Sequence, residues 1–206
     1  MEILSEAISG WLHTSLIEWV AVLLSLAYLI LAMKQNPWCW PCALISTALF
    51  TWVFFDVSLI MEAALSVYYM VMAVYGYWAW RRKVNAKALV ISTRPKSWHL
   101  KAIVVILGLS LVSGFILSKN TEAAWPYVDS LTTWGAVVTT YMVTQKIYEN
   151  WFYWLVVDSL ALALYLERGL YPSSLLMAVY LILVCIGLYQ WRRELKQATT
   201  DNVQPA

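Results

Sequence analysis

Three side chains near residue 150 combine aromatic rings with a carboxylate on one expected helix face. Trp151, Trp154 and Asp158 follow one another at intervals of three and four residues, so a helix places them on the same side. The segment is apolar enough to span a bilayer, where a carboxylate costs about 3 kcal/mol on insertion scales. Because indole faces attract cations, this face suits a flat, cationic ligand. The alternative is that both indoles belong to an interfacial belt and a neighbouring helix satisfies Asp158.

The composition of the whole chain indicates a membrane protein. Of its 206 residues, 62% are hydrophobic and 13% are charged, whereas soluble domains are about 45–50% apolar and about 25% charged. Thirteen Trp and thirteen Tyr exceed what interfacial belts usually need, which leaves aromatic residues for an internal site. We therefore predict an all-α polytopic protein in a lipid bilayer. The net charge of +2 gives no indication of a nucleic-acid partner.

Hydropathy predicts seven transmembrane helices, each long enough to cross a bilayer. The long basic link 81–101, which contains Arg94-Pro95, is interpreted as a cytoplasmic linker, and 192–206 as a cytoplasmic tail. The N-terminus is acidic and lacks the basic region of a signal peptide, so the first span is expected to be retained. The expected spans are 14–33, 38–55, 60–80, 102–118, 130–145, 151–166 and 171–191.

Basic residues are distributed unevenly between the two sides that these spans define. The poorer side has only Lys119 and Arg168. The positive-inside rule therefore predicts an N-terminus outside and a C-terminus in the cytoplasm. The richer side has Lys34, Arg81, Arg82, Lys83, Lys87, Arg94, Lys96, Lys101, Lys146, Arg192, Arg193 and Lys196.

The chain contains an internal repeat with an offset of 111 residues. The alignment joins 14–80 with 130–191 as two three-helix repeats and leaves 102–118 as a connecting helix. Because the connector is a single span, the repeats are parallel, and transporters commonly bind substrate between such repeats. The alternative is chance similarity between apolar segments. Matched positions include Trp40 with Trp151, Tyr69 with Tyr180, Gly76 with Gly187, and Trp80-Arg81-Arg82 with Trp191-Arg192-Arg193.

Several acids lie near the ends of the expected spans. An acid at a helix N-terminus is favoured by the macrodipole, which suits Asp129. The functional alternative is an acidic outer vestibule that concentrates cations. Glu62, just inside the third span, fits either interpretation. The residues in question are Glu18, Asp56, Asp129 and Glu167.

The aromatic residues of the third expected span divide by depth. Trp78 and Trp80 precede Arg81 and are interpreted as part of the inner aromatic belt. Tyr69 lies deeper and is the better ligand candidate. Tyr75 shares a face with Tyr68 and Met72, and Trp134 is the aromatic residue specific to the fifth span.

The sequence contains no nucleophile–base pair, metal-spaced His/Cys cluster or phosphate loop. We therefore predict no catalytic residues, no metal site and no cofactor. Cys39-Trp-Pro-Cys42 has the spacing of a redox motif but lacks a βαβ context, so we interpret it as a helix start. His13 and His99 lie at span ends and are expected to be solvated.

Four short motifs, three of them rich in aromatic residues, are spread over nearly the whole chain. They are Trp38-Cys39-Trp40-Pro41, Tyr75-Gly76-Tyr77-Trp78-Ala79-Trp80, Asp129-Ser130, and Glu149-Asn150-Trp151 followed by Trp154. Together they resemble the Pnu family of bacterial vitamin transporters, whose best-known members carry nicotinamide riboside. The resemblance implies a three-plus-one-plus-three fold similar to SWEET sugar transporters, a homotrimer in the bacterial inner membrane, and facilitated diffusion. It also implies a cytoplasmic kinase that traps the vitamin by phosphorylation.

The chain departs from the nicotinamide riboside members at positions where those often have Asn or Gln. Here Ser46, Ser66, Ala73 and Asp158 occur, which leaves fewer amides for a carboxamide or ribose and adds a charge. The family also contains transporters of thiamine, which is likewise an aromatic cation. The departures favour thiamine slightly over nicotinamide riboside, and the sequence leaves the identity of the vitamin open.

The resulting hypothesis is a passive, alternating-access uniporter for a cationic aromatic vitamin. In it Trp151, Trp154 and Tyr69 stack on the ring and Asp158 balances its charge. Trp40 and Ser46 complete the far wall. The other candidate substrate-binding residues are Ser66, Ala73, Tyr75 and Trp134.

Three alternatives are weighed against this hypothesis. A membrane-embedded enzyme acting on a lipid-like substrate would need paired catalytic groups at one depth, and only Asp158 is deeply placed. A non-transporting membrane scaffold would leave the intramembrane aromatic residues beside an acid unexplained. A proton-coupled transporter using Asp158 or Glu62 would depend on the proton gradient.

Overall fold

The computed structural model describes most of the chain. The predictions for His13 and Arg168 lie outside the described residues, as do those that depend on the side chains of Glu18, Asp56 and Glu62. The described residues are 16–56, 60–82, 89–120, 125–167, 169 and 171–201.

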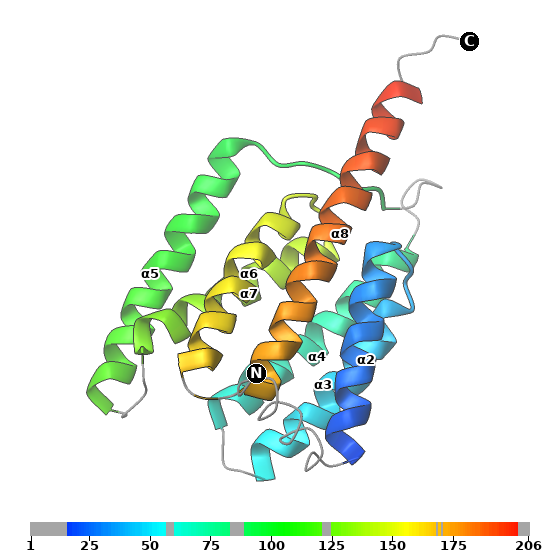
Figure 1. Ribbon diagram of the computed structural model, residues 1–206. Coiled ribbons are helices and arrows are strands. Elements are labelled where there is room, and N and C mark those ends of the chain that lie inside the picture. The colour runs from blue at the N-terminus through cyan, green and yellow to red at the C-terminus, as the bar shows by residue number, and fades with distance from the viewer. Residues whose placement is uncertain are drawn as a thin grey trace.

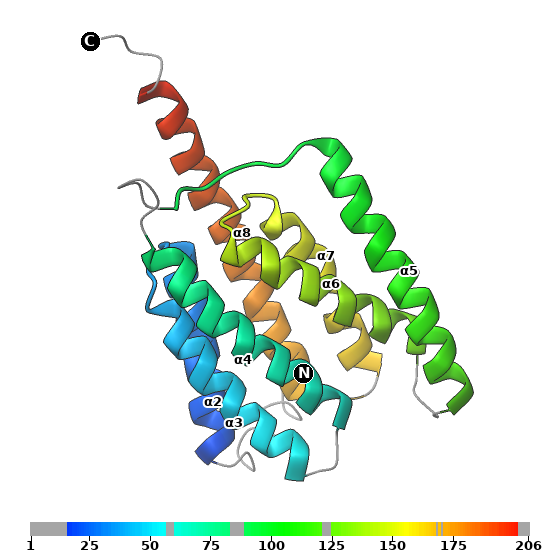
Figure 2. The same ribbon diagram turned by 180° about the vertical axis from the view of Figure 1, so that it is seen from behind.

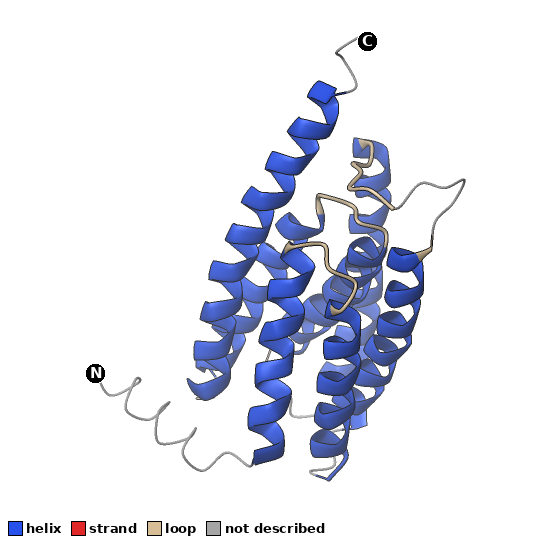
Figure 3. Cartoon of the chain, turned by 90° about the vertical axis from the view of Figure 1, so that its right-hand side faces the viewer, coloured by secondary structure: helices blue, strands red, loops and turns tan. Residues whose placement is uncertain are grey.

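Within these ranges the chain forms seven α-helices that run alongside one another (Figures 1 and 3). The all-helical prediction is confirmed. Lys96–Asn120 and Ser173–Gln197 are long and apolar enough to cross a membrane, and Trp19–Met33 and Cys39–Trp52 are shorter apolar helical stretches. The helices are α2 (Leu16–Met33), α3 (Cys39–Asp56), α4 (Ile60–Arg81), α5 (Lys96–Asn120), α6 (Pro126–Thr144), α7 (Asn150–Glu167) and α8 (Tyr171–Asp201).

Two helices extend beyond their predicted spans into polar sequence. The helix α5 begins at Lys96, directly after Pro95, and α8 continues to Asp201. Parts of the predicted linker 81–101 and of the predicted tail 192–206 are therefore helical. Hydropathy identifies where a helix leaves the hydrocarbon core of the bilayer, but it does not identify where the helix ends. Glu, Lys, Gln and Ala have high helix propensity, so the helix continues into water. A proline is tolerated where α5 starts because the first helical N–H groups have no intrahelical partner.

Six of the helices form two groups of three, and the seventh lies outside them. In one group α2 and α4 both pack on α3, and in the other α6 and α8 both pack on α7. The groups meet where α4 packs on α6 and α2 on α8. The helix α5 packs on α6 at the edge of the bundle, as the two opposite views show (Figures 1 and 2).

One end of the bundle carries most of the positive charge, and we call it the basic end. It includes the loops after α2 and α6 and the C-terminal part of α8, at the top of Figure 1. Lys119, at the end of α5, lies at the opposite end. The described basic residues at the basic end are Lys34, Arg81, Arg82, Arg94, Lys96, Lys101, Lys146, Arg192, Arg193 and Lys196.

Four indoles pack together near the basic end, and we call them the tryptophan cluster. Trp80 meets Trp40 edge-on, with ring centroids 5.3 Å apart and an interplanar angle of 84°. Trp191 meets Trp151 in the same way, at 5.4 Å and 86°. The cluster spans both helix groups, because the rings of Trp80 and Trp191 lie 6.5 Å apart.

The prediction that Trp80 belongs to an interfacial belt is wrong. It is buried in the tryptophan cluster, whereas its neighbour Trp78 is 53% exposed and has the guanidinium of Arg82 over its ring. The prediction for Trp80 was based on its distance from the end of the helix. Whether its side chain is buried depends on the helix face on which it lies. Residues two positions apart lie on different faces.

The contacts of the tryptophan cluster recur at the interval of the sequence repeat. Trp80 Nε1 donates a hydrogen bond to the carbonyl oxygen of Thr144, at 3.2 Å, and Trp191 Nε1 donates one to that of Met33, at 3.1 Å. Thr144 and Met33 are themselves 111 residues apart. Each indole thereby binds a terminal carbonyl of a helix in the other group, which the helix cannot satisfy itself.

Two glycines make room for the indoles of the first helical turns. A Cβ at Gly76 would collide with the ring of Trp40, and a Cβ at Gly187 with the ring of Trp151. By contrast, a Cβ at Gly108 on α5 would meet nothing within 4 Å. Close packing of a helix backbone on a large ring therefore requires glycine at these two positions.

We expect Gly187→Ala to destabilise the protein by about 1–3 kcal/mol, because the added methyl forces Trp151 out of its position. The matched control is Gly108→Ala, which should be neutral or stabilise the helix by about 0.5–1 kcal/mol. Thermal unfolding of the detergent-solubilised protein measures both. Equal effects of the two substitutions would contradict this account of Gly187.

Candidate functional site

Asp158 lies deep in the bundle without a partner of opposite charge. It is near the middle of α7, about 12 Å from either end of the helix at 1.5 Å per residue. Its side chain is 5% exposed, and among the described residues it makes no hydrogen bond or ion pair. A buried acid in apolar surroundings is costly, which makes Asp158 a candidate for a functional role.

Two tyrosines from different helix groups lie near the acid, and two more lie near those tyrosines; we call Tyr28, Tyr69, Tyr165 and Tyr180 the tyrosine cluster. The charge of Asp158 acts on the hydroxyls of Tyr69 on α4 and Tyr180 on α8. Tyr165 lies near Tyr69, and Tyr28 on α2 lies near both Tyr69 and Tyr180. The buried Asp158 and these partly buried tyrosines therefore lie together where the two groups meet.

Sequence reasoning found Asp158 and Tyr69 but missed Tyr28, Tyr165 and Tyr180. Tyr180 could have been found, because it is the repeat counterpart of Tyr69. Nothing in the pattern around Tyr28 or Tyr165 separates them from the other apolar positions of their helices.

The predicted wall formed by Ser46, Ser66 and Ala73 is buried. The hydroxyl of Ser46 donates a hydrogen bond to the carbonyl oxygen of Ala21 on α2, at 2.7 Å. Ala73 belongs to the apolar core that includes Trp40 and Trp80. In this arrangement Ser46 and Ala73 hold α2, α3 and α4 together.

Two predicted site residues lie apart from the others. Tyr75 is 37% exposed at the basic end, where its hydroxyl accepts a hydrogen bond from Gln145 at 2.8 Å. Trp134 turns toward α5, and its Nε1 donates to the hydroxyl of Ser113 at 3.1 Å. The structure does not bring these two side chains to Asp158.

The indoles of Trp40 and Trp151 combine apolar packing with unused hydrogen-bond donors. Both rings are 2% exposed, and neither Nε1 has an acceptor among the described residues. Most buried donors in proteins are paired, and an unpaired one costs about 1–3 kcal/mol. Trp154, one turn deeper on α7, is half-buried against the same core. The face predicted from the sequence thus leads from Trp151 past Trp154 to Asp158.

A buried lysine joins the two groups at the basic end. Lys146 Nζ donates to Oε1 of Gln35 at 3.1 Å and lies 4.7 Å from the ring centroid of Trp80. Gln35 in turn donates to the carboxylate of Glu194 on α8. Burial lowers the pKa of Lys146, which the charge of Glu194 partly opposes. We call Gln35, Lys146 and Glu194 the basic-end latch.

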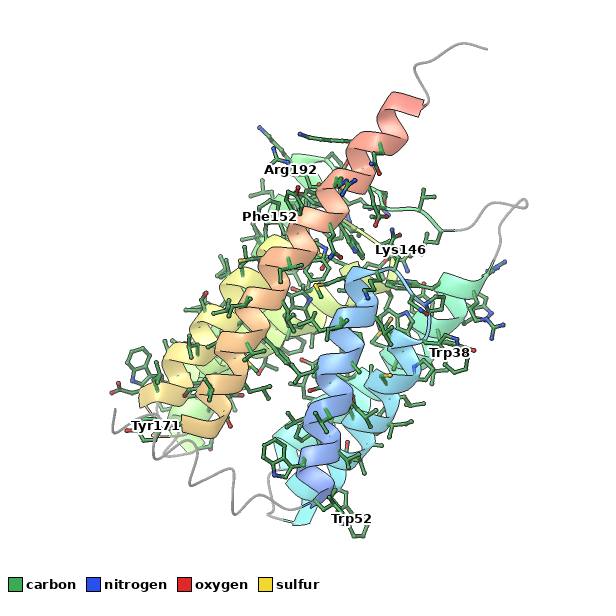
Figure 4. The ribbon with its side chains drawn as sticks, turned by 45° about the vertical axis from the view of Figure 1, so that its right-hand side comes forward. Trp38, Trp52, Lys146, Phe152, Tyr171 and Arg192 are labelled. Atoms are coloured by element: carbon green, nitrogen blue, oxygen red, sulfur yellow. The ribbon has the colours of Figure 1, made fainter. Side chains whose placement is uncertain are left out.

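Two residues of the basic-end latch occupy equivalent positions in the internal repeat. Gln35 and Lys146 are 111 residues apart, and both have left-handed backbone conformations, with φ of 52° and 49°. The counterparts thus hydrogen-bond to each other directly. Figure 4 shows Lys146, Phe152 and Arg192 toward the basic end and Trp52 and Tyr171 toward the other.

His99 contacts α7 and is not solvated as predicted. Its Nδ1 lies 3.0 Å from the hydroxyl of Tyr153, and its Nε2 lies 3.7 Å from the carboxylate of Glu149. The early start of α5 at Lys96 brings this residue onto the first turn of α7, which hydropathy could not indicate. In the described part of the chain no three His, Cys, Asp or Glu side chains are grouped as a metal site.

These features together define a class of protein. Apolar helices in two groups bury an acid beside a cluster of tyrosines, and buried acids of this kind are typical of proteins that move solutes or ions across the bilayer. The chain is therefore a polytopic membrane transporter.

Residues 15–193 match the model of the family described as nicotinamide mononucleotide transporter. The chain belongs to this family, the Pnu family of vitamin transporters.

Curated relatives and a solved structure agree with this assignment. The chain is 26% identical to the nicotinamide riboside transporter PnuC of Escherichia coli, over 87% of this chain and 85% of that protein. It is also 26% identical to the riboflavin/roseoflavin transporter RibM of Streptomyces davaonensis, over 84% and 83%. The crystal structure of the vitamin B3 transporter PnuC superposes with a TM-score of 0.73 at 18% identity. That alignment covers 95% of this chain and 88% of the other, and it shows the shared fold.

The latch predicts that Gln35→Ala loosens the basic end. Cys39 is buried behind it and reports opening when Cys42 and Cys185 are replaced by Ser. One hydrogen bond contributes about 1 kcal/mol, so we expect maleimide labelling of Cys39 to rise roughly fivefold. Lys34→Ala, which changes an exposed neighbour, should leave the labelling rate unchanged. Equal rates in Gln35→Ala and its parent would show that the latch does not hold this end closed.

Proposed function

We propose that the chain is a membrane uniporter that takes up a cationic aromatic vitamin by facilitated diffusion. The observation that carries this proposal is Asp158, an acid buried between the two helix groups with no cation among the described residues. A cationic solute would supply the missing charge. The tyrosine cluster suits an aromatic ring, because aromatic rings attract cations and stack on other rings.

Each part of the site has a proposed role in binding. Asp158 balances the charge of the solute, and Tyr69 and Trp154 stack on its ring. Trp40 and Trp151 carry unused indole N–H groups, which would donate hydrogen bonds to oxygen or nitrogen acceptors of the solute once the tryptophan cluster rearranges.

The charge of the site favours some vitamins over others. Thiamine and nicotinamide riboside are both aromatic cations, whereas riboflavin is neutral. Ser46, Ser66 and Ala73 provide no amide to pair with a carboxamide, and the hydroxyl of Ser46 already binds Ala21. We place thiamine ahead of nicotinamide riboside for this reason, although relatives are named for the latter.

We infer that the two helix groups are parallel repeats joined by α5, in a three-plus-one-plus-three arrangement like that of SWEET transporters. The support is the interval of 111 residues, which relates the hydrogen bonds of Trp80 and Trp191 and the pair Gln35–Lys146. Rocking of one group against the other would alternately open the two ends around Asp158. The tryptophan cluster and the latch would close the basic end in one of these states.

Topology and assembly complete the proposal. The positive-inside rule puts the basic end in the cytoplasm, where a vitamin kinase would trap the solute by phosphorylation. We also propose a homotrimer, as implied by the family resemblance. Its stoichiometry is measurable by light scattering of the purified protein.

Asp158→Asn should weaken binding of thiamine and nicotinamide riboside by about 30-fold or more. Losing one partner of a buried charge pair costs about 2–5 kcal/mol, and every 1.4 kcal/mol is tenfold. Quenching of tryptophan fluorescence in purified protein measures the dissociation constants. Glu167→Gln removes an exposed acid from the end of the same helix and should leave them unchanged.

Riboflavin provides a second control, because a neutral solute should gain little from Asp158. If Asp158→Asn left the affinity for both cations unchanged, the assigned role of Asp158 would be wrong. If the substitution weakened riboflavin equally, the loss would reflect a damaged site instead of a missing charge.

A uniporter requires no ion gradient. Uptake of radiolabelled thiamine into proteoliposomes should therefore be unaffected when a protonophore dissipates the proton gradient. Slower uptake under these conditions would support the proton-coupled alternative, with Asp158 as the proton carrier.

A further inference from the structure

A small cavity lies at the basic end, outside the site around Asp158. Its volume is about 170 Å³. It opens between the C-terminal part of α8 and the loops before α5 and α7, near Arg192 in Figure 4. Its lining residues are Thr93, Tyr148, Arg192, Leu195 and Lys196.

The polar groups of this cavity are donors suited to an anion. Arg192 and Lys196 are four residues apart on α8, so they share one face of the helix. Thr93 and Tyr148 add hydroxyl groups, and no carboxylate is among the lining residues. A guanidinium presents a fork of N–H groups that matches phosphate geometry, and a lysine adds a point charge.

The positions of the two hydroxyl residues are fixed by backbone hydrogen bonds. Ser92 N donates to the carbonyl oxygen of Lys146 at 3.0 Å, and Tyr148 N donates to that of Ser92 at 2.8 Å. The loop before α5 is thus held against the loop before α7, which brings Thr93 beside Tyr148. Burial raises the pKa of Tyr148, which the nearby Arg192 opposes, so this hydroxyl keeps the proton it can donate.

Two acids near the cavity already have other partners. Glu149 accepts a hydrogen bond from the backbone N of Arg94, at 3.3 Å, and lies beside His99. Glu194 accepts one from Gln35 in the latch. Neither carboxylate lines the cavity, and its charged lining residues are Arg192 and Lys196.

The size of the cavity limits its ligand. Sites that enclose whole small molecules measure about 300–1,000 Å³. A cavity of about 170 Å³ holds a phosphate group but not an entire vitamin. The remainder of a larger ligand would lie outside, toward the solvent or the bilayer.

We propose that Thr93, Tyr148, Arg192 and Lys196 form a binding site for a phosphate monoester. The group comes from one of two sources, a soluble phosphorylated compound or the headgroup of an anionic lipid. The first source deepens the proposed function, since trapping by phosphorylation would produce such a compound at this end. Tyr148 is two residues from Lys146, so an occupied site would stabilise the closed latch and slow further uptake.

The test measures the unfolding temperature of the full-length protein in nanodiscs. One arm adds inorganic phosphate or phenyl phosphate to nanodiscs of phosphatidylcholine, with sodium chloride at equal ionic strength as the reference. The other arm replaces part of the phosphatidylcholine with phosphatidic acid. A rise in the first arm identifies a soluble phosphate, and a rise in the second arm alone identifies the lipid headgroup.

The deciding variant is R192Q combined with K196Q, and its matched control is R193Q, the adjacent arginine that does not line the cavity. We expect the double variant to lose the rise and to weaken phosphate binding by about tenfold or more, as measured by calorimetry. R193Q should keep both. No rise in either arm, or a rise that survives in the double variant, would overturn the proposal.

Thiamine binding, measured by tryptophan quenching, distinguishes failure of the proposed phosphate site from failure of the proposed vitamin site. The double variant should bind thiamine as the parent does, because Asp158 lies in the middle of α7. Loss of thiamine binding together with the phosphate response would mean that the variant is damaged as a whole. The single variants R192Q and K196Q, each expected to weaken phosphate binding while leaving thiamine binding intact, would then decide.

Discussion

The packing of two indoles onto two glycines holds the rest of the structure in place. Trp40 lies on Gly76 within the first helix group, and Trp151 lies on Gly187 within the second. Each contact draws the first turn of one helix against the backbone of another, which no larger residue than glycine permits. The hydrogen bonds of Trp80 and Trp191 can reach the opposite group only because these rings are so placed.

The same arrangement leaves an acid at the place where the groups meet. In water a carboxylate needs no protein partner, but Asp158 lies between apolar helices, where Tyr69 and Tyr180 are near it. A transporter needs a site that is incomplete until the solute arrives, because a fully satisfied site would gain nothing from binding. In the proposed function, Asp158 and the indole N–H groups of Trp40 and Trp151, which have no acceptor in the described part of the chain, provide such a site.

At the basic end one short loop takes part in several interactions at once. Lys146 closes the latch with Gln35, and Ile147 forms a backbone bridge with Ser92. Tyr148 lines the small cavity beside Arg192. Because these residues are consecutive, a ligand bound at the surface can influence the contact between the helix groups through a few bonds. In our proposal, a ligand in the small cavity would therefore affect opening of the basic end through the short loop that contains Lys146, Ile147 and Tyr148.

The sequence by itself determined the helical class, the approximate positions of the seven helices, the family and the depth of Asp158 in its helix. The lengths of the apolar segments and the repeat interval of 111 residues are properties of the sequence that do not depend on how the helices pack. Only the tertiary structure decided which faces meet. It moved Trp80 from an expected belt into the core, turned Trp134 toward α5, and added Tyr28 and Tyr165 to the site. Hydropathy locates the apolar spans and so gives the depth of each residue in its helix. The partner of a side chain depends instead on how the neighbouring helices are rotated about their axes.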